Sequence, residues 1–237
     1  MTFSQFNLPS PSIRTIDDMR SVLYSPSASY DKPLYFMYRE VSRNETDRTW
    51  MQSHAIRYDI TVIPSVSLGG EYVKTKGHYH PENPAGIGYP ELYEVLEGIA
   101  HFLLQTNALD DVVLIEARKG DIVVIPPGYG HVTINPTLVE TLIMANLVST
   151  AFSSDYTWYD TMHGAAYYEL VGGDVSKNPA YPDVPPVRRM KNIRSMLSEL
   201  GRDKTLYEFI GNDRIAQLLN HPENFADFFI KSIGGIS

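Results

Sequence analysis

Between residues 34 and 170 the sequence contains many short, closely spaced β-like segments, and no helical pattern separates them. Strands spaced this closely leave no room for the crossover helices that a parallel sheet needs. The pattern therefore predicts a mainly β fold, with an antiparallel sandwich or barrel. The predicted strands are residues 34–41, 57–63, 71–75, 92–98, 100–106, 112–117, 121–126, 131–135, 139–149 and 167–171.

The chain on either side of this stretch has a different character. Before it, Asp17 and Asp18 stand in the first turn of a short helix predicted over residues 15–23, where the helix dipole favours carboxylates. After it come a linker rich in Pro and segments with apolar residues at helical spacing. We therefore expect an N-terminal segment with a short helix, a β-barrel, a linker and a C-terminal helical extension, at residues 1–30, 31–172, 173–187 and 188–237.

The C-terminal extension is predicted to contain three helices. Apolar residues recur at helical spacing over residues 188–200 and 205–220. Gly201 suits the C-cap of the first helix, and Asn224 suits the N-cap of a short final helix over residues 225–230. The extension carries too little positive charge for a DNA reader, so we expect it to pack on the barrel or at a subunit interface.

Composition excludes several classes of protein. The 237 residues are 43% apolar and 20% charged, as in ordinary globular proteins. A net charge of −8 argues against nucleic acid or an anionic membrane as the main partner. The chain has no cysteine, which excludes disulfides and thiolate metal sites. The N-terminus has neither a basic start nor a long apolar run, so no secretory signal is predicted and the cytoplasm is the expected location.

A set of histidines and one glutamate has the spacing of a metal site. His78 and His80 are two residues apart, so on a strand their side chains point to the same face. Glu91 stands at the start of the predicted strand 92–98 and His131 begins the one at 131–135, so both could complete a set of three histidines and one carboxylate. Such a set suits a first-row divalent metal with coordination positions left free for a substrate.

These residues belong to two longer motifs. In the first motif, Gly77-His78-x-His80 is followed after ten residues by Glu91 and after six more by Gly98. In the second, Gly120 is followed after five residues by Pro126-x-Gly128, after two more by His131 and after another three by Asn135. The pair resembles the motifs of the cupin superfamily, small antiparallel β-barrels (jelly rolls) with a metal site. The second motif matches at every fixed position. The first has a longer loop between His80 and Glu91 than is usual, and we expect that loop, residues 81–90, to form a wall of the substrate pocket.

A narrower resemblance lies within the cupins. The run from Thr75 to His80, followed by Glu91-Leu92-Tyr93, is similar to the cupin-type glucose-6-phosphate isomerases of archaea and some bacteria. The segments around Tyr38 and residues 58–61 are similar too, and the resemblance covers about residues 30–170. It implies a metal-dependent aldose–ketose isomerase that interconverts glucose 6-phosphate and fructose 6-phosphate in glycolysis and gluconeogenesis, working as a homodimer.

The resemblance also implies roles for individual residues. The metal ligands are His78, His80, Glu91 and His131, and they hold one divalent ion per subunit. Iron(II) is the expected metal, with manganese(II), nickel(II) and zinc(II) as alternatives. Glu91 and Tyr93 are the implied catalytic residues, and the route between aldose and ketose is left open between an enediol intermediate and a hydride shift.

Substrate contacts follow from the same resemblance. Thr61, Thr75 and the backbone of Gly77 are expected to hold the phosphate, with charge from Lys74 or Lys76. Tyr38, Tyr93 and Tyr156 are expected to contact the sugar. The family often has a histidine two residues before the tyrosine that corresponds to Tyr156, but Ser154 stands there. His163 is a candidate to replace it, whereas His54, His101 and His221 are expected to be structural or exposed.

A cupin barrel does not fix the function, so other readings stay open. One is an iron dioxygenase, or another sugar-phosphate isomerase or epimerase. Another is a non-catalytic cupin that senses a sugar phosphate and whose C-terminal helices dock a partner.

Overall fold

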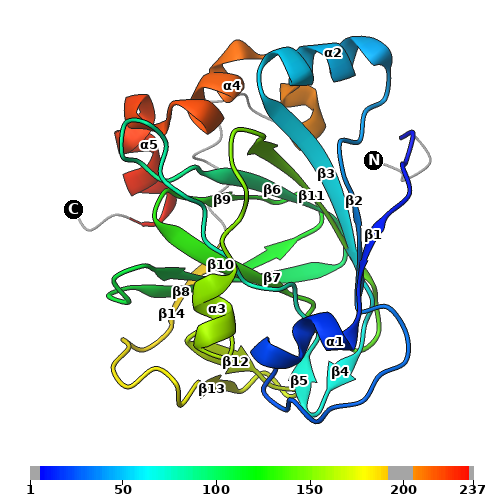
Figure 1. Cartoon of the computed structure of the whole chain (residues 1–237), viewed down its shortest axis with the longest axis vertical. Coiled ribbons are helices and arrows are strands. Elements are labelled where there is room, and N and C mark those ends of the chain that lie inside the picture. The colour runs from blue at the N-terminus through cyan, green and yellow to red at the C-terminus, as the bar shows by residue number, and fades with distance from the viewer. Residues whose placement is uncertain (1–5, 192–204, 235–237) are drawn as a thin grey trace.

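The computed structural model of the chain describes residues 6–191 and 205–234. The fold is mainly β, as predicted: two facing sheets form a barrel, with helices at its outer side (Figure 1). The larger sheet has the order β1-β2-β3-β11-β6-β9 and the smaller one β10-β7-β8-β14. Neighbouring strands are antiparallel in every pair except β14 with β8. In that order, the strands of the larger sheet are Ser12–Arg14, Tyr35–Tyr38, Ile56–Ile63, Leu142–Ser149, Glu91–Glu97 and Ile122–Ile125. The strands of the smaller sheet, again in order, are Tyr129–Ile134, Ile99–Thr106, Val112–Arg118 and Arg188–Lys191.

Most of the predicted strands are confirmed to within a few residues. The exception is the predicted strand at residues 71–75, of which only β5 (Glu71–Tyr72) is regular; it pairs with β4 (Ser67–Leu68). The chain beyond β5 runs extended beside β10, with Lys74 and His78 forming single bridges to it. A further small sheet joins β12 (Tyr167–Glu169) to β13 (Val175–Lys177).

The helices between residues 6 and 191 are short. The predicted N-terminal helix is confirmed as α1 (Ile16–Met19), followed by a 3₁₀ turn, η2 (Arg20–Val22). The carboxylate of Asp18 accepts hydrogen bonds from the backbone and the hydroxyl of Thr15 at its start. Two helices were not predicted, α2 (Glu45–Ser53) and α3 (Thr157–Thr161).

The C-terminal part departs from prediction in three places. Residues 188–191 form strand β14 instead of starting a helix, and the rest of the predicted helix, with Gly201, lies outside the described residues. The helix predicted over 205–220 is two elements, η4 (Leu206–Phe209) and α4 (Asp213–Asn220), because Gly211 adopts a left-handed conformation between them. Asn224 does not cap the last helix: Pro222 starts a 3₁₀ turn, η5 (Pro222–Phe225), and α5 (Ala226–Ser232) follows it.

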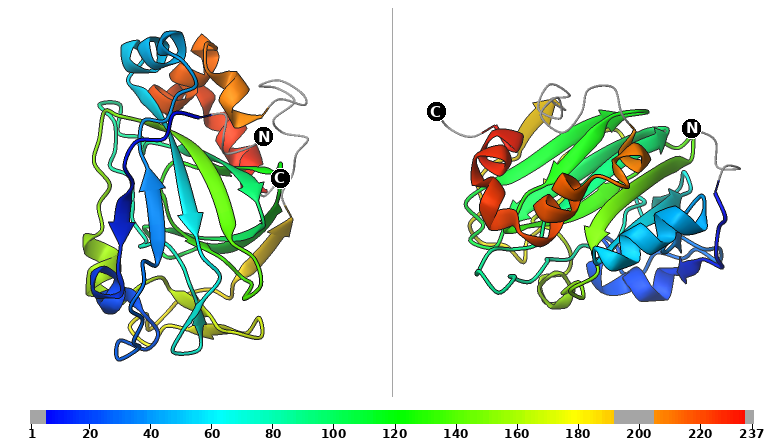
Figure 2. Two further views of the ribbon diagram at one scale, coloured as in Figure 1. Left: turned by 90° about the vertical axis from the view of Figure 1, so that its right-hand side faces the viewer. Right: turned by 90° about the horizontal axis from the view of Figure 1, so that it is seen from above.

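The larger sheet has two different faces because strand side chains alternate. Its inner face turns to the barrel interior. Its outer face carries apolar side chains such as Tyr58, Leu92 and Leu147, and the helices cover them with Phe209, Leu218 and others. Seen from above, α2 and the C-terminal helices lie next to each other in front of the strands (Figure 2). The outer face of the larger sheet is therefore covered in large part by the chain itself.

A helix that spans a membrane must be long and apolar. Among residues 6–191 and 205–234, no helix is long and apolar enough to cross a membrane.

The C-terminal helices should contribute to stability by covering the outer face of the larger sheet. Leu218 is fully buried in it, so Leu218→Ala should lower the free energy of unfolding by about 2–5 kcal/mol through lost burial and the cavity that remains. Ile230→Ala is the control, because Ile230 is 57% exposed and its truncation should change the free energy by under about 0.5 kcal/mol. Urea unfolding followed by circular dichroism measures both, and equal effects would contradict this packing.

Candidate metal centre

The structure brings together the four predicted metal ligands. The ligand atoms of His78, His80, Glu91 and His131 all lie within 4.8 Å of one another. Glu91 is the first residue of β6 and His131 lies in β10. His78 pairs with His131 across an antiparallel bridge, and His80, two residues on, has its ring on the same side. Residues from three segments of the chain thus converge inside the barrel.

Hydrogen bonds outside the cluster orient two of the rings. His80 Nδ1 lies 2.9 Å from the carbonyl oxygen of Tyr89, and His78 Nδ1 lies 3.4 Å from that of Lys76. A ring nitrogen that faces a carbonyl must carry the proton, which leaves the lone pair on Nε2. The Nε2 atoms of His80 and His131 lie 3.5 and 3.3 Å from Oε2 of Glu91. The ring of His80 therefore presents its Nε2 lone pair toward the carboxylate.

The charges of the cluster fit a bound cation. Burial lowers the pKa of His80 to about 4, and burial with the neighbouring imidazoles holds the pKa of His78 well below its usual value. Burial alone would raise the pKa of Glu91, but His131 and His80 more than offset it and the pKa is lowered. Among the described residues, Oε2 of Glu91 is buried and accepts no hydrogen bond. A buried carboxylate oxygen without a donor, together with the imidazoles beside it, is a donor set that a divalent metal satisfies.

Tyr93 brings a proton donor to the same place. Its hydroxyl oxygen lies 3.2 Å from Nε2 of His131. Burial, and then the negative charge of Glu91, raise the pKa of Tyr93 well above its usual value. Tyr93 therefore keeps its phenol proton at any physiological pH.

A cavity opens beside the cluster, and most of the predicted substrate residues line it. Thr61, Thr75, Tyr93 and Tyr156 are on its wall together with three of the four predicted metal ligands. The residues that line it are Tyr35, Met37, Arg39, Arg57, Thr61, Thr75, Lys76, His78, His80, Glu91, Tyr93, Met144, Asn146, Val148, Ser154 and Tyr156. Most of these side chains are polar, and they come from the larger sheet, from the extended segment at residues 75–80 and from residues 154–156.

Two of the predicted substrate residues lie elsewhere. Tyr38 is on the opposite face of β2 from Tyr35 and packs against the outer apolar cluster. Gly77 does not line the cavity; a Cβ there would lie 2.2 Å from the ring of Tyr159, so the close approach of that ring requires a glycine.

The two candidate lysines have different surroundings. Lys74 is buried, forms an ion pair with Glu71 and lies over the ring of Tyr168. Lys76 lines the cavity and forms an ion pair with Asp160, with 2.7 Å between Nζ and Oδ1. Of the two, only Lys76 faces the site.

The remaining histidines lie away from the cavity. His101 contacts Glu169 at 2.8 Å, and the Nδ1 atom of His163 lies 3.3 Å from the backbone carbonyl oxygen of Ser21. Ser154, where the family often has a histidine, does line the cavity.

Sequence reasoning did not assign Arg39, Arg57 and Asn146, which also line the cavity. A signal was present in β3, where Arg57, Asp59 and Thr61 alternate with the outward-facing Tyr58 and Ile60. A charged pair placed on the inner face of a buried strand is unusual enough to mark a site.

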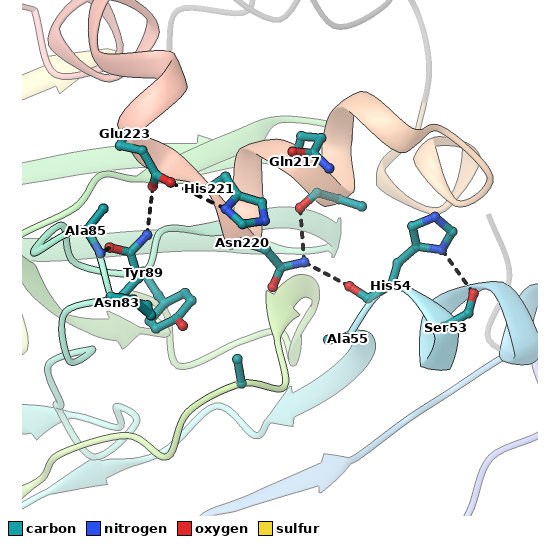
Figure 3. A pocket seen from close by; sticks show the side chains of 13 residues that line it. Ser53, His54, Ala55, Asn83, Ala85, Tyr89, Gln217, Asn220, His221 and Glu223 are labelled. Atoms are coloured by element: carbon teal, nitrogen blue, oxygen red, sulfur yellow. Dashed lines mark hydrogen bonds and ion pairs between the residues drawn. The ribbon is translucent and has the colours of Figure 1, made fainter.

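The loop between His80 and Glu91 was expected to form a wall of this cavity, and that expectation is wrong. No residue of 81–90, all within the described chain, lines the cavity. Asn83, Pro84, Ala85 and Tyr89 instead line a separate cleft with α4 and the end of α2 (Figure 3). The loop turns outward because its polar groups bond to each other and to the C-terminal helices.

Asn83 connects this loop to the C-terminal extension. Its side-chain oxygen accepts hydrogen bonds from the backbone of Ala85 and Ile87, and its Nδ2 donates to Glu223 at 2.7 Å (Figure 3). The far end of the loop is Tyr89, whose carbonyl oxygen faces His80. The loop therefore links the C-terminal extension to a predicted metal ligand.

The fold and the site define a class: a mainly β barrel with a three-histidine, one-carboxylate cluster that could hold a metal, beside a polar cavity. Residues 13–185 match the family described as Glucose-6-phosphate isomerase (GPI), and the chain belongs to that family.

Curated relatives agree with the family match over part of the chain. A glucose-6-phosphate isomerase of Thermococcus litoralis is 31% identical over 131 residues, which cover 52% of this chain and 62% of the relative. One of Thermococcus gammatolerans is 28% identical, covering 52% and 61%, and one of Pyrococcus furiosus is 34% identical, covering 34% and 40%. The matched stretch thus spans less than two thirds of each relative.

Loss of one ligand should abolish metal binding. Glu91→Ala leaves three imidazoles without the carboxylate, and His80→Ala removes one of the three nitrogens, so either variant should show no saturable manganese(II) binding in calorimetry. His54→Ala, at a histidine outside the cavity, is the control and should bind as the wild type does. Undiminished binding by Glu91→Ala would show that the cluster is not the site.

Asn83 should tune metal affinity from a distance. Asn83→Ala removes the acceptor that holds the loop turn and the donor to Glu223, so we expect metal affinity to fall by about 10-fold, the lower range for groups that orient a ligand. Glu223→Gln keeps an acceptor for Asn83 and should stay near wild type. A lower melting temperature with unchanged affinity would mean that the contact is structural only.

Proposed function

We propose that the chain is a metal-dependent aldose–ketose isomerase that interconverts glucose 6-phosphate and fructose 6-phosphate, a step of glycolysis and gluconeogenesis. The observation that carries the proposal is the buried cluster of His78, His80, Glu91 and His131 at a polar cavity, in a chain of this family. The chain covers only about three fifths of the length of its first two relatives, so its activity is proposed rather than transferred.

The phosphate is proposed to bind at the end of the cavity that contains Thr61, Thr75 and Lys76. The Thr75 hydroxyl oxygen accepts a hydrogen bond from the backbone of Thr133, and its own proton is left to donate. Thr61 is buried on the inner face of β3, and Lys76 adds an ammonium group. Tyr156 lies 5.2 Å from the ring of His78, between this end and the cluster, where it can contact the sugar.

The cofactor is proposed to be one divalent metal ion per subunit, iron(II) first among manganese(II), nickel(II) and zinc(II). When bound, such an ion supplies Lewis-acid chemistry that polarises a carbonyl group. The donor set of three imidazoles and one carboxylate supports a first-row metal of this kind.

Glu91 and Tyr93 are the proposed catalytic residues. The lowered pKa of Glu91 keeps it a carboxylate, so in an enediol route it can take a proton from one carbon and return it to the neighbour. Tyr93 keeps its proton and can donate a hydrogen bond to a sugar oxygen. In a hydride-shift route Glu91 transfers no proton, and its role is to contribute a negative charge to the site.

The cytoplasmic location is proposed from the cysteine-free composition, and the homodimer from the family resemblance. Light scattering of the purified protein tests the dimer, and a monomer mass would contradict it.

Activity should depend on metal. The coupled assay converts fructose 6-phosphate to glucose 6-phosphate and follows nicotinamide reduction by a glucose-6-phosphate dehydrogenase. We expect turnover after iron(II) loading, loss with a chelator and recovery with added metal, because the metal supplies the carbonyl polarisation. No turnover in metal-loaded protein would overturn the proposal. Oxygen uptake with a small substrate would then favour a dioxygenase, and binding without turnover would favour a sensor.

Isotopes separate the two routes. In D₂O, exchange through Glu91 should place deuterium at C2 of glucose 6-phosphate, which mass spectrometry detects. Complete retention of the transferred hydrogen would exclude Glu91 as a proton carrier and favour the hydride shift.

A further inference from the structure

A buried carboxylate holds two arginines together on the cavity wall. Asp59 is fully buried on the inner face of β3. Its Oδ2 accepts hydrogen bonds from Arg39 at 2.6 Å and from Arg57 Nε at 2.8 Å, while its Oδ1 accepts one from the backbone of Glu40 at 2.9 Å. Charge-assisted bonds of this length fix both guanidinium groups. Asp59 is therefore a positioning residue.

The two arginines retain charge and donors for a ligand. Both line the cavity, and their side chains are 40% and 28% exposed. One carboxylate balances only one of the two positive charges. Arg57 uses its Nε on Asp59, and within the described chain its two terminal nitrogens have no hydrogen-bond acceptor. Lys76, in contrast, is already paired with Asp160.

Strand register places this pair at the end of the cavity where the metal cluster lies. Arg57 is opposite Val148 on β11, and Val148 is opposite Glu91 on β6, so Arg57 and Glu91 lie in one row across the sheet. Thr61 lies four residues further along β3, which is about 13 Å at the rise of a strand. The cavity thus has a threonine end and an arginine end.

We propose that Arg39 and Arg57 bind the C1–C2 end of the substrate and stabilise the negative charge that develops on O1 or O2 during isomerisation. The inference rests on the proposed function and assigns two further catalytic residues to the same site. The reaction only moves hydrogen between C1 and C2, so either route polarises these oxygens and no other reactant is needed. Fixed positive charge aimed at developing negative charge is among the largest contributions to catalysis.

A ligand with a permanent negative charge at C1 should reveal the subsite. 6-Phosphogluconate and sorbitol 6-phosphate differ only at C1, where one has a carboxylate and the other an alcohol. Both place a phosphate at the threonine end. The ratio of their dissociation constants therefore reports on the C1 end alone.

The experiment measures both ligands by calorimetry on manganese-loaded and metal-free protein. In the wild type we expect 6-phosphogluconate to bind more tightly in both forms. In Arg57→Gln the preference for the carboxylate should fall by about 10-fold, the value of one charge-assisted hydrogen bond, while sorbitol 6-phosphate changes little. Arg39→Gln should act in the same direction, and Arg57→Lys should keep part of the preference because it keeps the charge.

Two further measurements distinguish a loss of the arginine subsite from a general change in the structure. Arg118→Gln removes a positive charge from an exposed arginine outside the cavity and should leave the preference unchanged. In the isomerase assay Arg57→Gln should lower kcat more than it raises KM, because the charge is needed mainly in the transition state.

The outcomes separate this inference from the proposed function. If Arg57→Gln and Arg39→Gln weaken both ligands equally, or leave the ratio unchanged, the arginine subsite is wrong while the isomerase can stand. If the metal-loaded wild type shows no turnover but the variants lose the carboxylate preference, the isomerase is wrong and the anion subsite stands. If the wild type has no preference for the carboxylate, the inference is overturned.

Discussion

The site depends on one interaction, the antiparallel pairing of the extended segment at residues 73–79 with β10. Four backbone hydrogen bonds hold it, from Asn135 to Val73, from Thr75 to Thr133, and in both directions between His78 and His131. They place His78 beside His131, and the alternation of an extended chain then puts His80 on the same side. Without this pairing, the two histidines of the first motif would have no fixed position relative to the third.

Covering the outer face of the larger sheet frees its inner face for polar groups. The helices bury Tyr58, Leu147 and Leu92 from outside, while Asp59, Asn146 and Tyr93 point inward from the same three strands. An inner face with buried charges is costly unless each charge is paired. Asp59 meets that condition through two arginines, and Glu91 through imidazoles and the metal that we propose.

Part of the fold and of the candidate site could be predicted from the sequence alone. The barrel and the convergence of His78, His80, Glu91 and His131 were predictable, because both follow from alternation and motif order. Arg39 and Arg57 were not assigned, since their place depends on the register of β3 with its neighbours, which no local pattern fixes. Tyr38 was expected in the pocket, although the choice of inward face on β2 is set by packing against the outer cluster. Residues 81–90 turn outward because Asn83 bonds to Glu223, 140 positions away.

The central claim is that one metal ion is held by these four residues inside the barrel. Its most direct test is an anomalous difference map from crystals of the protein grown with iron(II) or cobalt(II) and measured at the metal's absorption edge. We predict one peak per chain, within bonding distance of the Nε2 atoms of His78, His80 and His131 and of the Glu91 carboxylate. A map with no peak there, or with its peak in the cleft beside His54 and His221, would contradict the account.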